Sequence, residues 1–159
     1  MSYQGHCNCE SILITLLQQP PSSVICHCDC CKRAGGGPFS VNYIVDEAEL
    51  TIDDPHAILK LYDDKKSISG NVVKRYFCSS CGSPVFTKTP KAPGKVFLKA
   101  ALFDSVAHPK TEVFTKKQYQ WVTVENGERQ TRQDAGATPF REDPVFTLHP
   151  LDNDEKRTP

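Results

Sequence analysis

The chain has 159 residues, enough for one domain with a buried core. Hydrophobic residues make up 38% and charged residues 24%, which excludes a disordered polyelectrolyte and a membrane protein. The 19 basic residues balance the 19 acidic ones, so the chain lacks the positive excess of phosphate-binding proteins. We therefore expect neither a nucleic-acid partner nor a membrane partner.

Short segments rich in Val, Ile, Phe, Tyr and Thr alternate with turn signals about every ten residues, which predicts a mainly β fold. Twelve prolines and nine glycines leave little room for long helices. We expect only short helical turns, one after Cys31 and one over residues 46–50. The expected strands cover, in chain order, residues 11–17, 22–26, 39–45, 58–62, 72–77, 85–88, 96–101 and 112–115.

The composition changes at residue 125, where apolar residues become scarce until residues 145–148. This change predicts a domain over residues 3–124 and a loosely attached extension over residues 125–159. We expect the end of the extension to be disordered from Asp152 onward.

Cysteine is the unusual residue of this chain, with 8 copies among 159 residues. The N-terminal residues MSYQGHCNCE lack the basic and apolar segments of a secretion signal, and the longest apolar segment, residues 12–17, is too short to cross a bilayer. We expect a reducing location, cytoplasmic or nuclear. In such compartments, clustered cysteines serve as metal ligands or catalytic thiols more often than as disulfides.

Two cysteine pairs predict a structural zinc site. Cys78 and Cys81 are separated by two residues and followed by Gly82, which is typical of a zinc knuckle at the tip of a hairpin. Cys7 and Cys9 can point to the same side of an extended segment and contribute two further thiolates. Together the four cysteines would complete a tetrahedral site.

The remaining cluster, Cys26, Cys28 and Cys31, predicts a catalytic zinc site, because three protein ligands leave one position open. Zn²⁺ with three thiolates carries a formal charge of −1 and is better suited to holding a substrate thiolate than to activating water. Lys32 and Arg33 follow directly and are predicted to offset this negative charge. Gly35, Gly36 and Gly37 form either a substrate loop that offers backbone N–H groups or a plain flexible loop.

The alternative is a second structural zinc whose fourth ligand is Cys30, His27 or His6. Adjacent residues of an extended chain point to opposite sides. We therefore expect Cys30 to remain a free thiol and His27 to face away from the metal.

Three motifs together resemble the family of glutathione-dependent formaldehyde-activating enzymes and centromere protein V. They are G-H-C-N-C at residues 5–9, C-H-C-D-C-C-K-R-A-G-G-G-P-F at 26–39 and S-G-N-V-V-K-R-Y-F-C-S-S-C-G-S-P-V-F at 69–86. The segment K-V-F-L-K-A-A-L-F-D at 95–104 and Trp121 also resemble that family, and the similarity covers about residues 3–124. Ala101 occupies a place where the family often has Gly, and Cys30 is an extra thiol.

This resemblance implies a β-tent of small antiparallel sheets with two zinc ions per chain, a structural one at Cys7, Cys9, Cys78 and Cys81 and a catalytic one at Cys26, Cys28 and Cys31. It also implies a carbon–sulfur lyase acting on adducts of glutathione, or another thiol, with formaldehyde or a related electrophile. One alternative is a non-catalytic zinc-binding interaction module, as in centromere protein V. Another is a redox sensor in which Cys30 forms a disulfide with a released zinc ligand.

Overall fold

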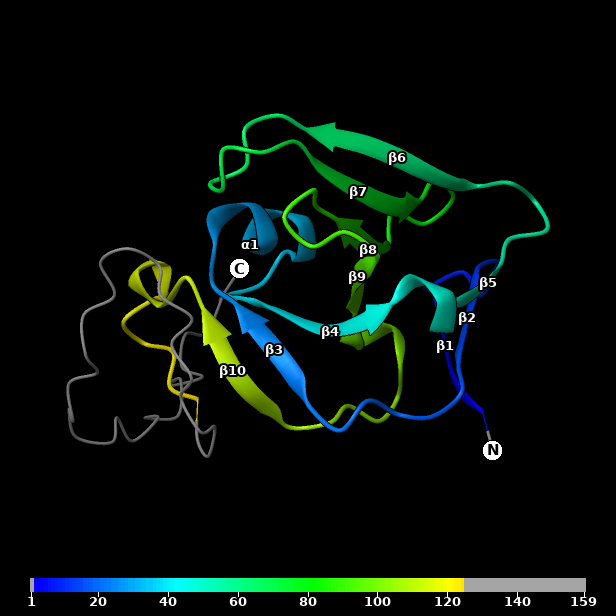
Figure 1. Cartoon of the computed structure of the whole chain (residues 1–159), viewed down its shortest axis with the longest axis horizontal. Helices are drawn as coiled ribbons and strands as arrows, with labels where there is room; N and C mark the ends of the chain where they lie inside the picture. The colour runs from blue at the N-terminus through cyan, green and yellow to red at the C-terminus, as the bar shows by residue number, and fades with distance from the viewer. Residues whose placement is uncertain (1, 125–159) are drawn as a thin grey trace, which may run out of the picture.

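The computed structural model describes residues 2–124, which form two β-sheets, one short α-helix and three 3₁₀ turns (Figure 1). The mainly β fold predicted from the sequence is confirmed. The predicted extension over residues 125–159, including the disorder expected from Asp152 onward, lies outside the described residues. Within residues 2–124 no helix is long and apolar enough to span a bilayer.

The smaller sheet is antiparallel, in the order β1-β2-β5. Its strands are β1 (Tyr3–His6), β2 (Leu13–Leu16) and β5 (Thr51–Asp53). Alternation along β2 buries Ile14 and Leu16 against the rest of the core. The strands β1 and β5 are absent from the predicted set, because segments of three or four residues with a glycine or acidic residues carry too little periodic signal.

The larger sheet has seven strands in the order β10-β3-β4-β9-β8-β7-β6. Its strands are β3 (Ser23–Cys26), β4 (Ser40–Asp46), β6 (Leu59–Asp64), β7 (Val73–Cys78), β8 (Pro84–Lys88), β9 (Lys95–Lys99) and β10 (Pro109–Val113). Six of the predicted strands overlap β3, β4, β6, β7, β8 and β9. All pairings are antiparallel except that of β10 with β3. The three-stranded sheet is small and antiparallel, as expected. The seven-stranded sheet is larger and contains one parallel pair.

Three segments differ in detail from the predicted elements. The predicted strand over residues 96–101 ends at Lys99, and the chain turns into η2 (Ala100–Leu102). The predicted strand over 112–115 lies earlier, as β10, because Phe114 adopts a left-handed conformation (φ 58°) and ends it before η3 (Thr115–Lys117). The predicted turn over 46–50 is present as η1 (Glu47–Glu49).

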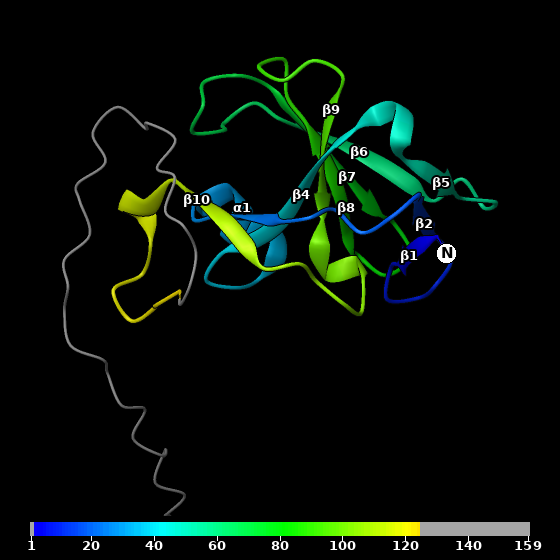
Figure 2. The same ribbon diagram turned by 60° about the horizontal axis from the view of Figure 1, so that its bottom comes forward.

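The helix α1 (Asp29–Gly35) begins two residues before Cys31, whereas the prediction places it after Cys31. The Cys28 sulfur caps its first turn by accepting a hydrogen bond from the Cys31 N–H at 3.4 Å. Gly36 ends it in the left-handed conformation (φ 66°) and donates its N–H to the Lys32 carbonyl at 2.8 Å. Figures 1 and 2 show α1 beside β4, and in Figure 1 it lies between β3–β4 and the β6–β7 hairpin.

The two faces of the seven-stranded sheet differ in character. On one face, Tyr43, Val45, Val96 and Leu98 are buried in the hydrophobic core that the sheet shares with β2. Directly paired residues share a face, and alternate residues of a strand return to it. The opposite face, which we call the α1 face, therefore carries Cys26 across from Ser40, Asn42 across from Lys99, and Ile44 across from Phe97.

Gly5 of β1 lies close to the end of η2. A Cβ at this position would lie 2.5 Å from the Leu102 carbonyl oxygen and 2.8 Å from Phe103 Cδ1. We therefore expect Gly5→Ala to lower the free energy of unfolding by about 1–3 kcal/mol, as overpacked substitutions do. Urea denaturation checks this, with Gly35→Ala as control, since nothing lies within 4 Å of that Cβ. Equal stability of the two variants would contradict this close packing of β1.

Candidate metal centres

Four cysteines from two distant segments meet at one end of the molecule. The Sγ atoms of Cys7, Cys9, Cys78 and Cys81 all lie within 4.8 Å of one another. Cys7 and Cys9 follow β1, and the other two flank the turn between β7 and β8, where Gly82 takes the left-handed conformation (φ 76°) as its place after Cys81 predicts. The Cys7–Cys9 and Cys9–Cys78 sulfur distances are 3.5 and 3.7 Å. These distances fit the edge of about 3.8 Å expected for tetrahedral zinc thiolates with Zn–S near about 2.3 Å.

Ser83 joins the two halves of this group. Its hydroxyl oxygen accepts the Asn8 N–H at 3.0 Å and lies 3.2 Å from the Cys81 sulfur. Its hydrogen bond lowers the pKa of Cys81 to about 5, whereas burial raises the pKa of Cys78 to about 11. The thiol of Cys81 is therefore readily deprotonated, and a bound cation would favour the thiolate form of Cys78.

Three cysteines form a second group at the start of α1. Cys26 ends β3, Cys28 caps the helix and Cys31 lies in its first turn, and their Sγ atoms all lie within 4.8 Å of one another. The Cys26 and Cys28 sulfurs are 3.5 Å apart, again a spacing that fits zinc thiolates. No fourth Cys, His, Asp or Glu within residues 2–124 joins this group. A metal held by these three thiols keeps a position that the described residues do not fill.

The three alternative fourth ligands have other contacts. His27 is fully buried, and its Nε2 lies 2.8 Å from Glu112 Oε2 on β10. The Cys30 sulfur lies 3.9 Å from the Lys66 carbonyl oxygen, and His6 Nδ1 lies 3.0 Å from the Cys7 carbonyl oxygen. The structure therefore places none of them in the three-cysteine group.

Two cations that the sequence did not single out lie beside the three-cysteine group. Lys99 is only 5% exposed, and its Nζ donates to Ser40 Oγ at 2.7 Å and Asn42 Oδ1 at 2.9 Å. Arg75 is held by Asp64, to which its Nε donates at 2.9 Å. Hydrogen bonds from the Cys26 and Cys28 thiols lower the pKa of Cys31, and the charges of Lys99 and Arg75 lower it further.

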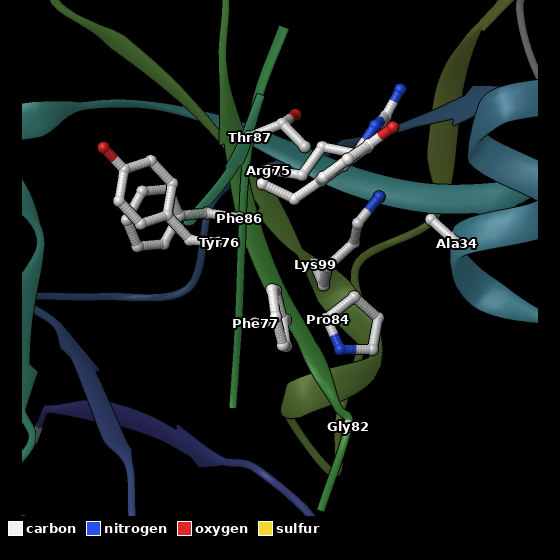
Figure 3. Close-up of a pocket in the computed structure, with 10 residues that line it drawn as sticks. Ala34, Arg75, Tyr76, Phe77, Gly82, Pro84, Phe86, Thr87 and Lys99 are labelled. Atoms are coloured by element: carbon white, nitrogen blue, oxygen red, sulfur yellow. The ribbon is translucent and has the colours of Figure 1, made fainter. Parts of the chain in front are cut away.

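Lys99 and Arg75 line a cleft of about 320 Å³, which we call the cationic cleft. Figure 3 shows their nitrogen-bearing ends on the side of the sheet from which Ala34 of α1 approaches. Tyr62 and Phe77 also line the cleft, whereas the stacked rings of Tyr76 and Phe86, 4.2 Å apart, lie on the other side of the strand in Figure 3. The cleft thus combines two positive charges with aromatic surface.

Lys32, which is predicted to offset the charge of the three-cysteine group, has contacts outside that group. Its Nζ donates to the Lys117 carbonyl at 2.7 Å and lies 3.9 Å from the centre of the Tyr119 ring, on which Trp121 stacks. Arg33 is exposed. Among the charged side chains, Lys99 and Arg75 lower the pKa of Cys31 most, and the roles of Lys32 and Arg33 stay predictions.

Gly35 ends α1, and Gly36 and Gly37 follow it. Gly35 and Gly36 line a cleft of about 600 Å³ that also reaches Lys99 and Ala101, whereas Gly37 is outside its wall. This placement fits a substrate loop for the first two glycines, and their role stays a prediction.

Replacing Lys99 by methionine is expected to weaken metal binding at the three-cysteine group. The ligands must be deprotonated to bind, and the loss of a nearby positive charge makes this harder. A change of one pKa unit corresponds to about 1.4 kcal/mol, so we expect roughly a tenfold higher dissociation constant. Competition with a zinc chelator measures it. Lys74→Met, at a half-exposed lysine paired with Asp63, is the control, and the same shift in both variants would contradict the role of Lys99.

The fold and the two cysteine groups define a small mainly β protein with two places that could each hold a metal ion. Residues 2–117 match the sequence model of the family described as glutathione-dependent formaldehyde-activating enzyme. Because the match covers more than half of the chain, the protein belongs to this family.

Individual relatives are distant. A Schizosaccharomyces pombe protein named as an uncharacterized lyase is 22% identical over 104 residues, which are 65% of this chain and 70% of the relative. A Halomonas elongata protein that carries the family's name is 26% identical over 136 residues, 81% of this chain and 85% of that one. The crystal structure of a Rhodobacter sphaeroides protein matches with a TM-score of 0.50 and 20% identity, over 66% of this chain and 98% of that chain. This last similarity shows the fold alone.

Proposed function

We propose that the protein is a zinc-dependent carbon–sulfur lyase that forms and cleaves adducts of glutathione, or another thiol, with formaldehyde or a related aldehyde. The observation that carries the proposal is the group of three cysteines, which no fourth ligand from residues 2–124 joins, beside two cations. Family membership and the name of the yeast relative support the same class of reaction.

The two cysteine groups have different roles in this proposal. Cys7, Cys9, Cys78 and Cys81 would hold a structural zinc that ties the end of β1 to the β7–β8 turn. Cys26, Cys28 and Cys31 would hold the second zinc, which when bound offers an open position for a thiolate and lowers the pKa of a thiol there.

The reaction itself needs little from the protein beyond binding and orientation. The thiol sulfur forms a bond with the aldehyde carbon, and the aldehyde oxygen takes up the proton that the thiol has lost; cleavage reverses both changes. Holding the two reactants together supplies most of the rate advantage. Glutathione carries two carboxylates, which Lys99 and Arg75 of the cationic cleft are placed to attract.

The test is exchange between free glutathione and its formaldehyde adduct, followed by NMR with and without the zinc-loaded protein. We expect exchange that rises in proportion to protein concentration and saturates with glutathione. A folded protein that carries two zinc ions and leaves exchange unchanged, with the formaldehyde adduct and with adducts of larger aldehydes, would overturn the proposal and would favour a non-catalytic zinc module instead.

A further inference from the structure

Another cleft, on the α1 face of the seven-stranded sheet, reaches the three-cysteine group. It has a volume of about 260 Å³, and Cys26 and Cys31 form part of its wall. We call it the apolar cleft, because most of the remaining wall is hydrophobic. Its hydrophobic residues are Val24, Ile44, Phe97, Val113 and Phe114.

The strand register explains why these side chains gather there. Ile44 of β4 lies directly across from Phe97 of β9, and Val113 of β10 lies across from Cys26. All of them share the α1 face with Cys26, and none belongs to the hydrophobic core on the other face. Ile44 is 38% exposed and Phe97 is half-buried, so the cleft is an accessible hydrophobic surface beside the thiols.

Asn42 separates the apolar cleft from the positive charges. It borders the apolar cleft, while its side-chain oxygen accepts a hydrogen bond from Lys99 of the cationic cleft. A molecule held at the cysteines therefore has a charged environment on one side and a hydrophobic one on the other. The carboxylates of a thiol such as glutathione match the first side only.

The size of the apolar cleft exceeds what formaldehyde needs. Formaldehyde has one carbon and no hydrophobic group, whereas a dry apolar cavity of about 150 Å³ already binds benzene. Burial of hydrocarbon stabilises a complex by about 0.8 kcal/mol for each CH₂. A one-carbon partner would leave this wall in contact with water and gain nothing from it.

We infer that the aldehyde partner of the substrate carries a hydrophobic group, an aryl or branched alkyl chain, which lies in the apolar cleft. This inference rests on the proposed lyase function and specifies its substrate class. The bond changes are the same: carbon–sulfur bond formation with protonation of the aldehyde oxygen, and the reverse on cleavage. The hydrophobic group lies next to the reacting carbon and takes no part in the chemistry.

The experiment compares two glutathione adducts, those of formaldehyde and phenylacetaldehyde, by NMR exchange with the zinc-loaded protein. We expect kcat/KM, corrected for the uncatalysed rate, to be at least tenfold higher for the phenylacetaldehyde adduct. Ile44→Asn should lower the ratio of the two values about tenfold, the range expected for loss of contact in a hydrophobic pocket. Leu61→Asn, at a similarly exposed position of β6 outside the cleft, should leave the ratio unchanged.

The results distinguish a failure of the hydrophobic-aldehyde inference from a failure of the proposed lyase function. Catalysis of the formaldehyde adduct with no preference for phenylacetaldehyde would overturn the inference and leave the lyase proposal intact. Absence of exchange with both adducts would overturn both. The comparison in the wild-type protein does not depend on the variants, so a poorly folded Ile44→Asn protein leaves the test in place.

Discussion

Cys78→Ser is expected to prevent folding. The Cys78 sulfur is fully buried at the junction of β7, the following turn and the segment after β1, and serine is a far weaker zinc ligand than a thiolate. Zinc binding at structural sites of small domains contributes about 10–16 kcal/mol in zinc-finger peptides, which is as large as the total stability of a domain. Circular dichroism and thermal denaturation should therefore show no cooperative transition.

Ser80→Ala is the matched control for this prediction. Ser80 lies in the same turn, is exposed and is outside the four-sulfur group, so its replacement should leave the transition in place. A soluble Cys78→Ser protein with a cooperative transition like that of the wild type would show that the four-cysteine group does not hold the fold together.

Cys28→Ser is expected to remove catalysis and keep the fold. Serine is a good helix N-cap, so it can replace the cap that the Cys28 sulfur gives α1, while the thiolate for the metal is lost. We expect the exchange rate between glutathione and its aldehyde adducts to fall at least about a hundredfold, in the range typical of losing a group that stabilises a transition state. The same NMR exchange assay and a thermal transition measure the two effects separately.

Cys30→Ser is the control for this second prediction. Cys30 is two residues away from Cys28, in the first turn of α1, but its sulfur lies near the Lys66 carbonyl and outside the three-sulfur group. Its replacement should retain the exchange activity. If Cys30→Ser lost activity and Cys28→Ser kept it, the assignment of Cys28 as a metal ligand and Cys30 as a free thiol would be wrong.

The cysteine groups could be anticipated from the sequence because their geometry is local. Residues at i and i+2 of an extended segment, and at i and i+3 of a tight turn, can converge wherever the rest of the chain goes. The turn after Cys78 also specifies its own conformation, since Gly82 takes a positive φ that other residues adopt with strain. The glycine in this turn also predicts the hairpin that β7 and β8 form around it.

The cations beside the three-cysteine group could not be predicted in this way. Lys32 and Arg33 follow Cys31 in sequence, but consecutive residues of a helix point about 100° apart, so Lys32 contacts Lys117 and Tyr119 instead. Lys99 reaches the group only through the pairing of β9 with β4. Side chains alternate between the two faces along β9, and Val96 and Leu98 point into the core. This alternation is the local feature of the sequence that places Lys99 on the opposite face.

The bounds of β10 and its parallel pairing with β3 could not be predicted from the sequence. Its sequence, PKTEV, has no apolar alternation, and its partner β3 lies far away in the chain. The pair is joined in part by the buried contact between His27 and Glu112, two residues that carry no recognisable pattern in the sequence.

The zinc content of the purified, chelator-free protein shows whether Cys26, Cys28 and Cys31 form a second metal site beside the four-cysteine site. With one site of four cysteines and another of three, we predict close to two zinc ions per chain by elemental analysis, and close to one in the folded Cys28→Ser protein. A wild-type value near one, with its transition intact, would contradict the claim that Cys26, Cys28 and Cys31 form a metal site.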